Sequence, residues 1–369
     1  MTPMKTVLAL VVGLAAFATA PARSADVATP DDTAKFLAGL PVSADSPLAP
    51  LTQTPGWKAH ATHFGASFAS FEKRQSSRIR VWSQAHLTSP KPNLLYMFSG
   101  PDFLYADAFF PQATTYVLSG LEPVGQIPDA TRVAQGAMPH ELSRLRTSLR
   151  SVLSISFFLT NHMRSDLRSG RFLGTLPLIY VFLARTGHTI RDVSLVYLDA
   201  NGELKTDDPG RAKSASQGVK IAFTNKAGRD QTLYYFSTNL ANDGVKKSGF
   251  LDFCAKLGEA DAFVKSASYL MHGGGFTTVR NFLLEHATTI VQDDTGVPLA
   301  YFDRSKWQLE PYGHYVHPIP LFSHRYQPNM RQFFAKSKAP KIDFGIGYRH
   351  RPNESSFLVA TKKAAASKP

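Results

Sequence analysis

The chain has 369 residues, 43% of them hydrophobic, and carries 41 Lys and Arg against 28 Asp and Glu, a net charge of +13. This length allows one large domain or two ordinary ones, and the single cysteine, Cys254, excludes an internal disulfide. Because the basic residues are spread along the chain and no recognised nucleic-acid module is present, no nucleic-acid partner is expected.

The first segment, residues 1–25, has the pattern of a secretory signal peptide. Lys5 precedes an apolar stretch, and Ala22 and Ala25 are small residues suited to cleavage. Later apolar stretches, 151–160 and 173–184, are too short to span a bilayer, so no transmembrane segment is expected in the mature chain. The pattern predicts a secreted bacterial protein located in the periplasm or outside the cell.

Composition suggests how the remaining chain is divided. Residues 26–55 are rich in Pro, Asp, Ser and Thr, which predicts a linker or surface arm with a short helix, Asp31–Leu40, capped by Asp31 and Asp32. Residues 56–360 are expected to form a single α/β domain, or two α/β halves of about 56–190 and 191–360. Residues 361–369 are expected to be a disordered basic tail.

Apolar spacing predicts several elements before residue 190. Residues 57–71 repeat apolar side chains every three or four positions, which indicates a helix, and residues 78–87 fit either a helix or a strand. Residues 93–125 read as strand, turn, helix and strand, with two unalternating apolar runs typical of parallel strands covered on both faces. A long helix is expected at about 139–168, and a buried strand or helix at 176–183.

The second half predicts further strands, helices and turns. Antiparallel strands are expected at 193–198, 219–224 and 232–237, a helix at 250–257 and a strand at 262–267. A helix is predicted at 276–286, capped by Thr277 or Thr278, and two hairpins at 289–302 and 342–360. The predicted fold is therefore α/β, with a mostly parallel Rossmann-like sheet, flanking helices, and antiparallel hairpins in the middle and at the C-terminus.

The turn after the first strand carries the first candidate site. Ser99 and Asp102 lie in Phe98-Ser99-Gly100-Pro101-Asp102, and Glu122 follows the next strand. Ligands of open parallel sheets bind at the carboxyl ends of the strands, so these three residues are candidate ligand-binding groups. Helix capping is the alternative role for Ser99 and Asp102, and a surface turn for Glu122.

This turn resembles the phosphate-side turn of Rossmann-type methyltransferases, in which a strand ends in a similar FSGP string and a second strand ends in an acid. Asp102 and Phe103 stand where that family has further glycines. The resemblance therefore implies a fold and not an activity.

Three other motifs are incomplete. His272-Gly273-Gly274-Gly275 is similar to the oxyanion string of lipases and esterases, yet the chain has no Gly-x-Ser-x-Gly elbow. The glycine loop can instead present N–H groups to an anion or simply connect two elements. Asp294-Thr295-Gly296 resembles one of the two loops of an aspartic protease, and a turn is the alternative. Cys254 is expected to be buried and inert.

A second candidate region lies at residues 292–317. Gln292, Tyr312 and Tyr315 are candidate ligand-binding residues, since amides and aromatic rings suit a polar or flat ligand. Asp293, Asp294, His314 and His317 are candidate acid and base groups. The histidines lack the Glu of an HExxH pattern, so no metal site is expected, and no cofactor can be named.

Three classes of function remain open. The leading hypothesis is a binding protein for a small polar or anionic ligand of the cell envelope, held at Ser99, Asp102 and Glu122 and walled by residues 292–317. The second is a hydrolase acting on an envelope component, and the third is a structural or interaction protein without catalytic activity. Substrate and oligomeric state do not follow from the sequence.

Overall fold

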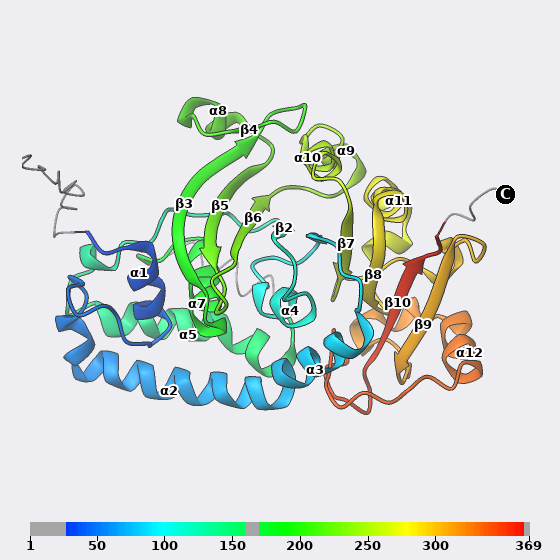
Figure 1. Ribbon diagram of the computed structural model, residues 1–369, viewed down its shortest axis with the longest axis horizontal. Coiled ribbons are helices and arrows are strands. Elements are labelled where there is room, and N and C mark those ends of the chain that lie inside the picture. The colour runs from blue at the N-terminus through cyan, green and yellow to red at the C-terminus, as the bar shows by residue number, and fades with distance from the viewer. Residues whose placement is uncertain (1–26, 159–169, 365–369) are drawn as a thin grey trace, which may run out of the picture.

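The computed structural model describes residues 27–158 and 170–364, so the expected signal peptide, residues 1–25, lies outside the described residues. One ten-stranded sheet organises the fold, in the order β4-β3-β5-β6-β2-β1-β7-β8-β10-β9 (Figure 1). The strands are β1 (Asn93–Tyr96), β2 (Thr115–Gly120), β3 (Thr189–Leu198), β4 (Leu204–Lys205), β5 (Gln217–Thr224), β6 (Asp230–Ser237), β7 (Ala260–Val264), β8 (Ala287–Asp293), β9 (Trp307–Gly313) and β10 (Ser356–Lys362).

The sheet is mixed, not mostly parallel as predicted. The central strands β6, β2, β1, β7 and β8 are parallel to one another. On one side β5, β3 and β4 continue the sheet antiparallel, and on the other side β10 is antiparallel to both β8 and β9. The antiparallel strands of the middle of the chain therefore extend the sheet at one edge instead of forming a separate layer.

Helices cover both faces of the sheet. They are α1 (Pro30–Leu37), α2 (Pro55–Phe71), α3 (Ser77–His86), α4 (Phe103–Phe109), α5 (Met138–Ile155), α7 (Leu176–Thr186), α8 (Asp208–Lys213), α9 (Asn242–Val245), α10 (Phe250–Lys256), α11 (Thr277–His286) and α12 (Pro328–Lys336). Apolar residues of α1, α2, α3, α4, α5 and α7 belong to one core, and those of α9, α10 and α11 belong to the core on the other face. Figure 1 shows α2 along the lower side and α9, α10 and α11 together at the upper right.

Strand β1 shows why two cores form. Leu94 and Tyr96 belong to the core on the α4 side, whereas Leu95 and Met97 belong to the core on the α11 side. Since successive side chains of a strand point to opposite faces, an unbroken apolar run supplies both cores at once. The predicted unit of strand, helix and parallel strand at residues 93–125 is confirmed by β1, α4 and β2.

Both predicted hairpins are wrong. Val297 does not return as a strand, because the Gln292 side chain accepts from its N–H at 2.8 Å and donates to its carbonyl at 2.7 Å, which closes a compact loop. The edge of β8 is occupied by β10 instead. Residues 342–348 form no strand, since Gln75 and Ser355 side chains accept from the N–H groups of Gly345 and Ile346.

Helix ends differ from the predictions in three places. The long helix ends at Ile155, where Ser156 has a left-handed backbone with φ of 74°. Residues 159–168 of the predicted helix lie outside the described part of the chain. Thr29, not Asp31 or Asp32, caps α1. No side chain of its own caps α11, and Asn242 from α9 accepts from Thr278 N–H at 3.0 Å instead.

The two ends of the described chain are part of the packed structure. Phe36 and Leu37 of α1, within the expected arm at 26–55, are fully buried, and α1 packs on α7. Thr361 and Lys362, within the expected disordered tail, belong to β10. Among the described residues, no helix combines the length and the apolar character needed to cross a bilayer.

Candidate functional site

A cavity of about 190 Å³ opens where β1, β2, β6 and β7 end. It is lined by Tyr96, Phe98, Ser99, Gly100, Asp102, Gly120, Leu121, Glu122, Phe157, Phe158, Thr238, Asn239, Leu240, Lys265, Ser266, Ala267, Ser268, Leu270, Phe276 and Tyr348. The lining combines aromatic rings with hydroxyl, amide, carboxylate and ammonium groups. A small ligand with both a polar and an apolar part fits this composition.

The cavity lies at the point in the parallel part of the sheet where the strand order reverses. From β1 the chain passes through α4 to β2 on one side, whereas from β7 it passes through α11 to β8 on the other side. The two helices pack on opposite faces, so the loops after β1 and β7 diverge. In open α/β sheets the crevice at such a point is the usual ligand site, because neither loop covers it.

A buried ion pair forms part of the cavity lining. Lys265 Nζ, after β7, lies 2.9 Å from Asp102 Oδ2, after β1, and each side chain is only 2% exposed. Asp102 also accepts from the Tyr96 hydroxyl at 2.9 Å and from Tyr105 N–H at 3.3 Å, which caps α4. Lys265 also donates to the Ser156 carbonyl. Because both charges have several partners, the pair ties together the two loops that diverge at this point.

Backbone strain is concentrated around the same cavity. Six non-glycine residues in the described chain have positive φ, and three of them line the cavity: Phe98 at 63°, Ser266 at 54° and Ser268 at 51°. Tyr269, at 56°, directly follows the last of these. Side chains rarely adopt this conformation, and residues that hold it cluster at functional sites. The loops after β1 and β7 are thus held in a shape that packing alone does not favour.

The loop after β7 is fixed by polar contacts from later in the chain. Ser266 N–H donates to Asp293 Oδ2 at 2.8 Å, and the Tyr348 hydroxyl donates to the Ser266 carbonyl at 3.0 Å. The Tyr348 and Ser268 hydroxyls are 2.7 Å apart. The Ser266 hydroxyl itself has no hydrogen-bond partner among the described residues. It is therefore a polar group at the cavity wall that a ligand can satisfy.

Glu122 adds a carboxylate to the wall, beside the end of β2. The residue is 4% exposed, and its backbone carbonyl accepts from the Tyr235 hydroxyl at 2.8 Å. Glycine at 120 makes this position possible, because a Cβ there would overlap the Glu122 carboxylate and approach Gly100 Cα to 3.0 Å. Two glycines thus let the ends of β1 and β2 come together around an acid.

The first group of predicted site residues is brought together here. Ser99, Asp102 and Glu122 all line the cavity. The Ser99 hydroxyl accepts from Ser119 N–H at 3.1 Å and donates to the Gly100 carbonyl at 2.8 Å, so it also joins the ends of β1 and β2. Asp102 serves as a helix cap as well as part of the wall.

The acidic pair of the second group lies behind the wall and not on it. Asp293 accepts from Ser266 and from the N–H and hydroxyl of Thr295, and Asp294 accepts from the Tyr269 hydroxyl at 2.5 Å. Burial raises the pKa of both carboxyls, that of Asp294 to about 7, with Asp293 adding to the effect. Gln292 is fully buried and holds the loop at Val297.

The other predicted residues do not line this cavity. The predicted histidines His314 and His317 are exposed, and His317 Nδ1 contacts the Arg349 guanidinium at 2.7 Å. The Tyr312 ring packs among Trp82 and Phe357, with its hydroxyl 3.2 Å from His86 Nδ1. The Tyr315 hydroxyl accepts from Gln327 N–H at 3.0 Å. The structure therefore brings Ser99, Asp102 and Glu122 together in one cavity. The predicted site residues of the 292–317 region do not line it.

Most lining residues had no place in the sequence-based site, among them Lys265, Phe276 and Tyr348. Lys265 was placed inside a strand, but β7 ends at Val264, so its side chain is at the strand end. The Phe276 ring lies 5.9 Å from that of Phe98, across the cavity mouth from β1. Tyr348 comes from a segment predicted as a hairpin. A strand end three residues earlier, at Val264 instead of Ala267, would have identified Lys265 from the sequence. Tyr348 carries no local signal.

The structure also places two other features noted in the sequence, the glycines after His272 and the cysteine at position 254. The glycines after His272 lead through a short turn, Gly274–Phe276, into α11, and Asn242 donates to the Gly274 carbonyl at 2.8 Å. Burial lowers the pKa of His272 to about 4, which leaves the ring neutral near pH 7. Cys254 is buried, and burial raises the pKa of its thiol. In the part of the chain that is described, no group of three or more His, Cys, Asp or Glu is placed to hold a metal ion.

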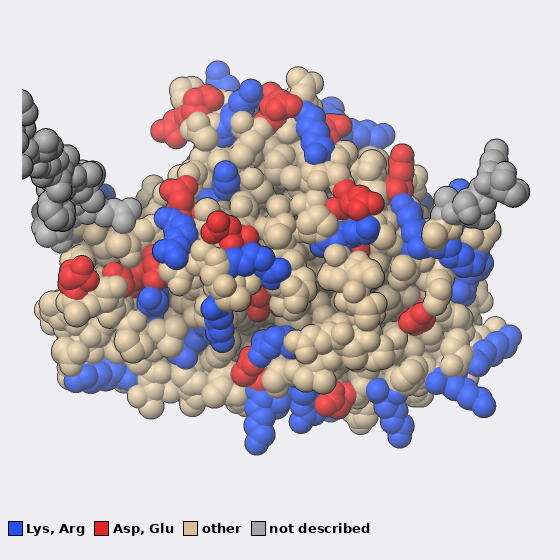
Figure 2. All heavy atoms as spheres, viewed as in Figure 1, with Lys and Arg blue, Asp and Glu red and all other residues tan. Residues whose placement is uncertain are grey.

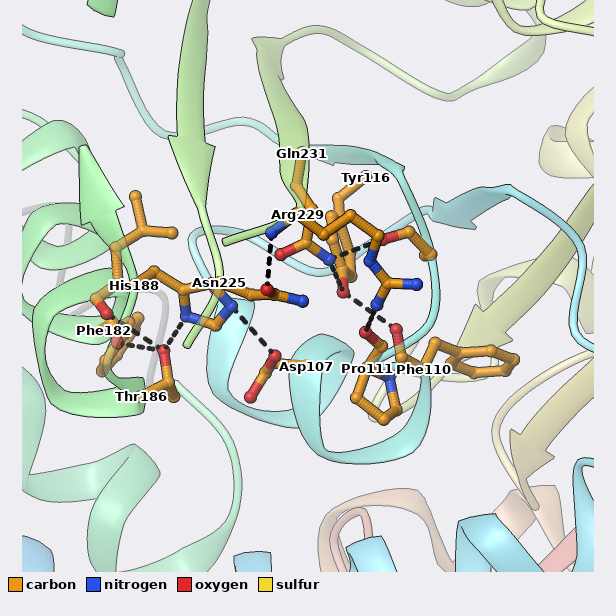
Figure 3. Close-up of polar contacts among 12 residues, drawn as sticks. Asp107, Phe110, Pro111, Tyr116, Phe182, Thr186, His188, Asn225, Arg229 and Gln231 are labelled. Carbon is orange, nitrogen blue, oxygen red and sulfur yellow. Dashed lines mark hydrogen bonds and ion pairs between the residues drawn. The ribbon is translucent and has the colours of Figure 1, made fainter. Parts of the chain in front are cut away.

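A separate polar cluster lies at the starting ends of β2 and β6, away from the cavity (Figure 3). His188 Nε2 is 3.5 Å from Asp107 Oδ1, and His188 Nδ1 is 2.7 Å from the Thr186 hydroxyl. Burial raises the pKa of Asp107 to about 7 and lowers that of His188 to about 4. Between these values both side chains are neutral, so the contact is not an ion pair.

Comparison with known proteins does not assign this chain to a group. No family model, no curated protein and no solved structure matches it. The site must therefore be interpreted from its own geometry.

Proposed function

We propose that the protein binds a small hydroxyl-bearing ligand in the cavity at the ends of β1, β2, β6 and β7. The observation that carries this proposal is the set of strained residues, Phe98, Ser266 and Ser268, which line one cavity together with a buried ion pair. Strain of this kind costs on the order of 1–3 kcal/mol per residue, and it persists where a defined loop shape is needed. A cavity built only by chance packing would not need it.

The arrangement of the parallel strands supports a Rossmann-like interpretation. Numbered in chain order, the five parallel strands lie as 3-2-1-4-5, and in the Rossmann arrangement the order is 3-2-1-4-5-6. In that arrangement an acid after the second strand binds ribose hydroxyls, and Glu122 occupies this position. Phe98 and Phe276 provide aromatic surface for the apolar part of such a ligand.

The polar groups of the cavity suit a ligand that carries hydroxyl groups. Lys265 is compensated by Asp102, and the Glu122 carboxylate lies in the wall. Sugar hydroxyls suit these groups, because a carboxylate accepts hydrogen bonds from them and the Ser266 hydroxyl can pair with them. Given the expected secretion signal, a saccharide component of the cell envelope is the ligand class that we infer.

Calorimetry and thermal unfolding with monosaccharides, muropeptides and nucleosides test this proposal. We expect one class to bind, and Glu122→Gln to weaken its binding by about 10-fold or more, since hydrogen bonds to a charged group contribute roughly 1.5–3 kcal/mol. Glu259→Gln, at an exposed position before β7, is the matched control and should bind like the wild type. No response to any of these ligands would instead support a structural or interaction protein.

A hydrolase acting on an envelope component is the second proposal. It is supported by the adjacent buried carboxyls of Asp293 and Asp294, because the pKa of Asp294 is raised to about 7, a value suited to a general acid. Both carboxyls are occupied by structural hydrogen bonds behind the cavity wall, so binding alone has the stronger support. Hydrolysis of a bound envelope saccharide, lost in Asp294→Asn, would reverse this order.

A further inference from the structure

The Arg185 guanidinium has no hydrogen-bonding partner in the described chain, although it is partly buried. Its Nε and Nη2 atoms are covered from solvent and make no hydrogen bond, and no carboxylate of the described residues forms an ion pair with it. Arginine is almost never buried unpaired, because its donors lose water without replacement. An unpaired buried guanidinium therefore requires an explanation.

Capping of α7 does not supply that explanation. Arg185 is in the last turn of this helix, where a positive charge interacts favourably with the helix dipole. The N–H groups of Gly187 and His188 and the Thr186 hydroxyl donate to carbonyls of the last turn, those of Phe182, Leu183 and Ala184. The Arg185 guanidinium takes no part in these hydrogen bonds.

The side chain is held in place by α2. Its guanidinium carbon lies 5.0 Å from the Phe64 ring centre and 5.6 Å from that of Phe68, so the cation rests against two rings one helical turn apart. Gly65 lies between the two rings, and its Cα faces the guanidinium, since a Cβ there would be in ordinary contact with Nη2 at 3.8 Å. These contacts fix the position of the guanidinium and use its faces. Nε and Nη2 are covered, so an anion can reach the guanidinium only from the Nη1 side.

A second arginine increases the positive potential nearby. Arg146 Nη1, from α5, lies 3.0 Å from Nδ1 of His60, and His60 Nε2 is 2.9 Å from the Leu37 carbonyl. The carbonyl can only accept, so Nε2 carries the proton and Nδ1 accepts from Arg146. The pKa of His60 is lowered to about 4, mainly by burial and also by the charges of both Arg146 and Arg185. Both cations are therefore close to this neutral ring, with exposed His63 beside it.

We propose that Arg185, assisted by Arg146, binds a small oxyanion at the surface formed by α2, α5 and α7. An oxyanion of the phosphate or carboxylate type accepts from several N–H groups of one guanidinium at once, which is the recognition that Arg provides and Lys does not. This site is distinct from the cavity at the ends of β1 and β7, whose lining includes none of these residues.

Thermal unfolding of the full chain in phosphate-free buffer is the test. Millimolar inorganic phosphate should raise the Tm by about 2 °C or more over chloride at equal ionic strength, because a ligand that binds only the folded state stabilises it. Acetate, in a parallel series, shows whether a carboxylate is also accepted. The absence of a phosphate effect in the wild type would refute the site without any variant.

Two variants locate the effect, and two control variants test its specificity. Arg185→Met keeps the length and apolar contacts of the side chain, and should fold without phosphate as well as the wild type but lose its phosphate response. Arg146→Gln should keep a reduced response, and Arg331→Met, an exposed arginine of α12, the full response. An equal response in Arg185→Met, or a large loss of Tm without phosphate, would show that Arg185 is only structural. Glu122→Gln should leave the phosphate response unchanged, which separates this site from the cavity.

Discussion

The Lys265 ammonium lies 2.9 Å from the Asp102 carboxylate. This contact joins the loop after β7 to the loop after β1, at the point where the strand order of the sheet reverses. The two residues are far apart in the sequence but share one buried position. The pair has a structural role as well as a place in the cavity wall, since Asp102 also caps α4 and Lys265 also binds the Ser156 carbonyl.

The first prediction concerns this ion pair. Lys265→Met and Asp102→Asn should each lower the free energy of unfolding by about 3–5 kcal/mol, because each leaves a buried partner uncompensated. The double variant should lose clearly less than the sum, as urea unfolding of all four proteins would show. Additive losses would contradict a direct interaction. Lys91→Met, which breaks the exposed contact with Glu259, should change stability little.

Replacement of Gly120 tests the geometry around Glu122. Gly120→Ala should destabilise the protein by about 1–3 kcal/mol and weaken ligand binding in the cavity, because the new methyl group overlaps the Glu122 carboxylate and crowds Gly100. Gly136→Ala is the control, since a Cβ at that position meets no atom within 4 Å. Similar unfolding curves for both variants would mean that Glu122 can move away freely.

The Asp107 and His188 contact predicts opposite dependences of stability on pH. Asp107 has a folded pKa of about 7, raised from 3.8, so the folded state holds its proton more tightly and stability falls as pH rises from about 4 to 7. His188 has a folded pKa of about 4, lowered from 6.5, so stability falls as pH drops from 6.5 towards 4. Lys226 and Arg80 oppose the Asp107 shift.

Substitutions should separate these two contributions. Relative to the wild type, Asp107→Asn should become more stable with rising pH across this window, and His188→Gln should become more stable with falling pH. The limiting slope for one proton is about 1.4 kcal/mol per pH unit, measured by urea unfolding at a series of pH values. The exposed Asp230→Asn variant should follow the wild type. Curves for Asp107→Asn that run parallel to the wild type would show that this carboxyl is ionised when folded.

Thiol labelling tests the burial of Cys254. The thiol lies on the buried face of α10 and its pKa is raised by burial, so both access and thiolate formation are suppressed. The native protein should resist a thiol reagent under conditions that label the urea-unfolded chain completely. Rapid labelling of the native state would mean that α10 opens locally.

Local signals explain which elements were predictable from the sequence. The helix at 57–71 has apolar residues at helical spacing, and β1, α4 and β2 combine apolar runs with clear turn residues, so both were predicted correctly. Strand β9 was missed because Pro311 lies within it. Proline is tolerated there since β9 is the edge of the sheet, which the chain order does not reveal.

Of the two groups of predicted site residues, only the first lines the cavity. Ser99, Asp102 and Glu122 could be found because the rule about strand ends needs only local strand boundaries. Lys265, Phe276 and Tyr348 enter the cavity through long-range packing, and no spacing in the chain relates them to β1. The strain at Phe98 and Ser266 was equally invisible, because neither residue type favours positive φ.

Strand β10 is the last element of the described chain, yet it lies inside the sheet, between β8 and β9. During synthesis β9 emerges before the strand that must connect it to β8, so the sheet cannot close until residues 356–362 have left the ribosome. Until then, the exposed borders of β8 and β9 are open to pairing with other chains. Completion of the sheet should therefore wait for β10, and its late arrival leaves two strand borders unpaired for longer than any other part of the sheet.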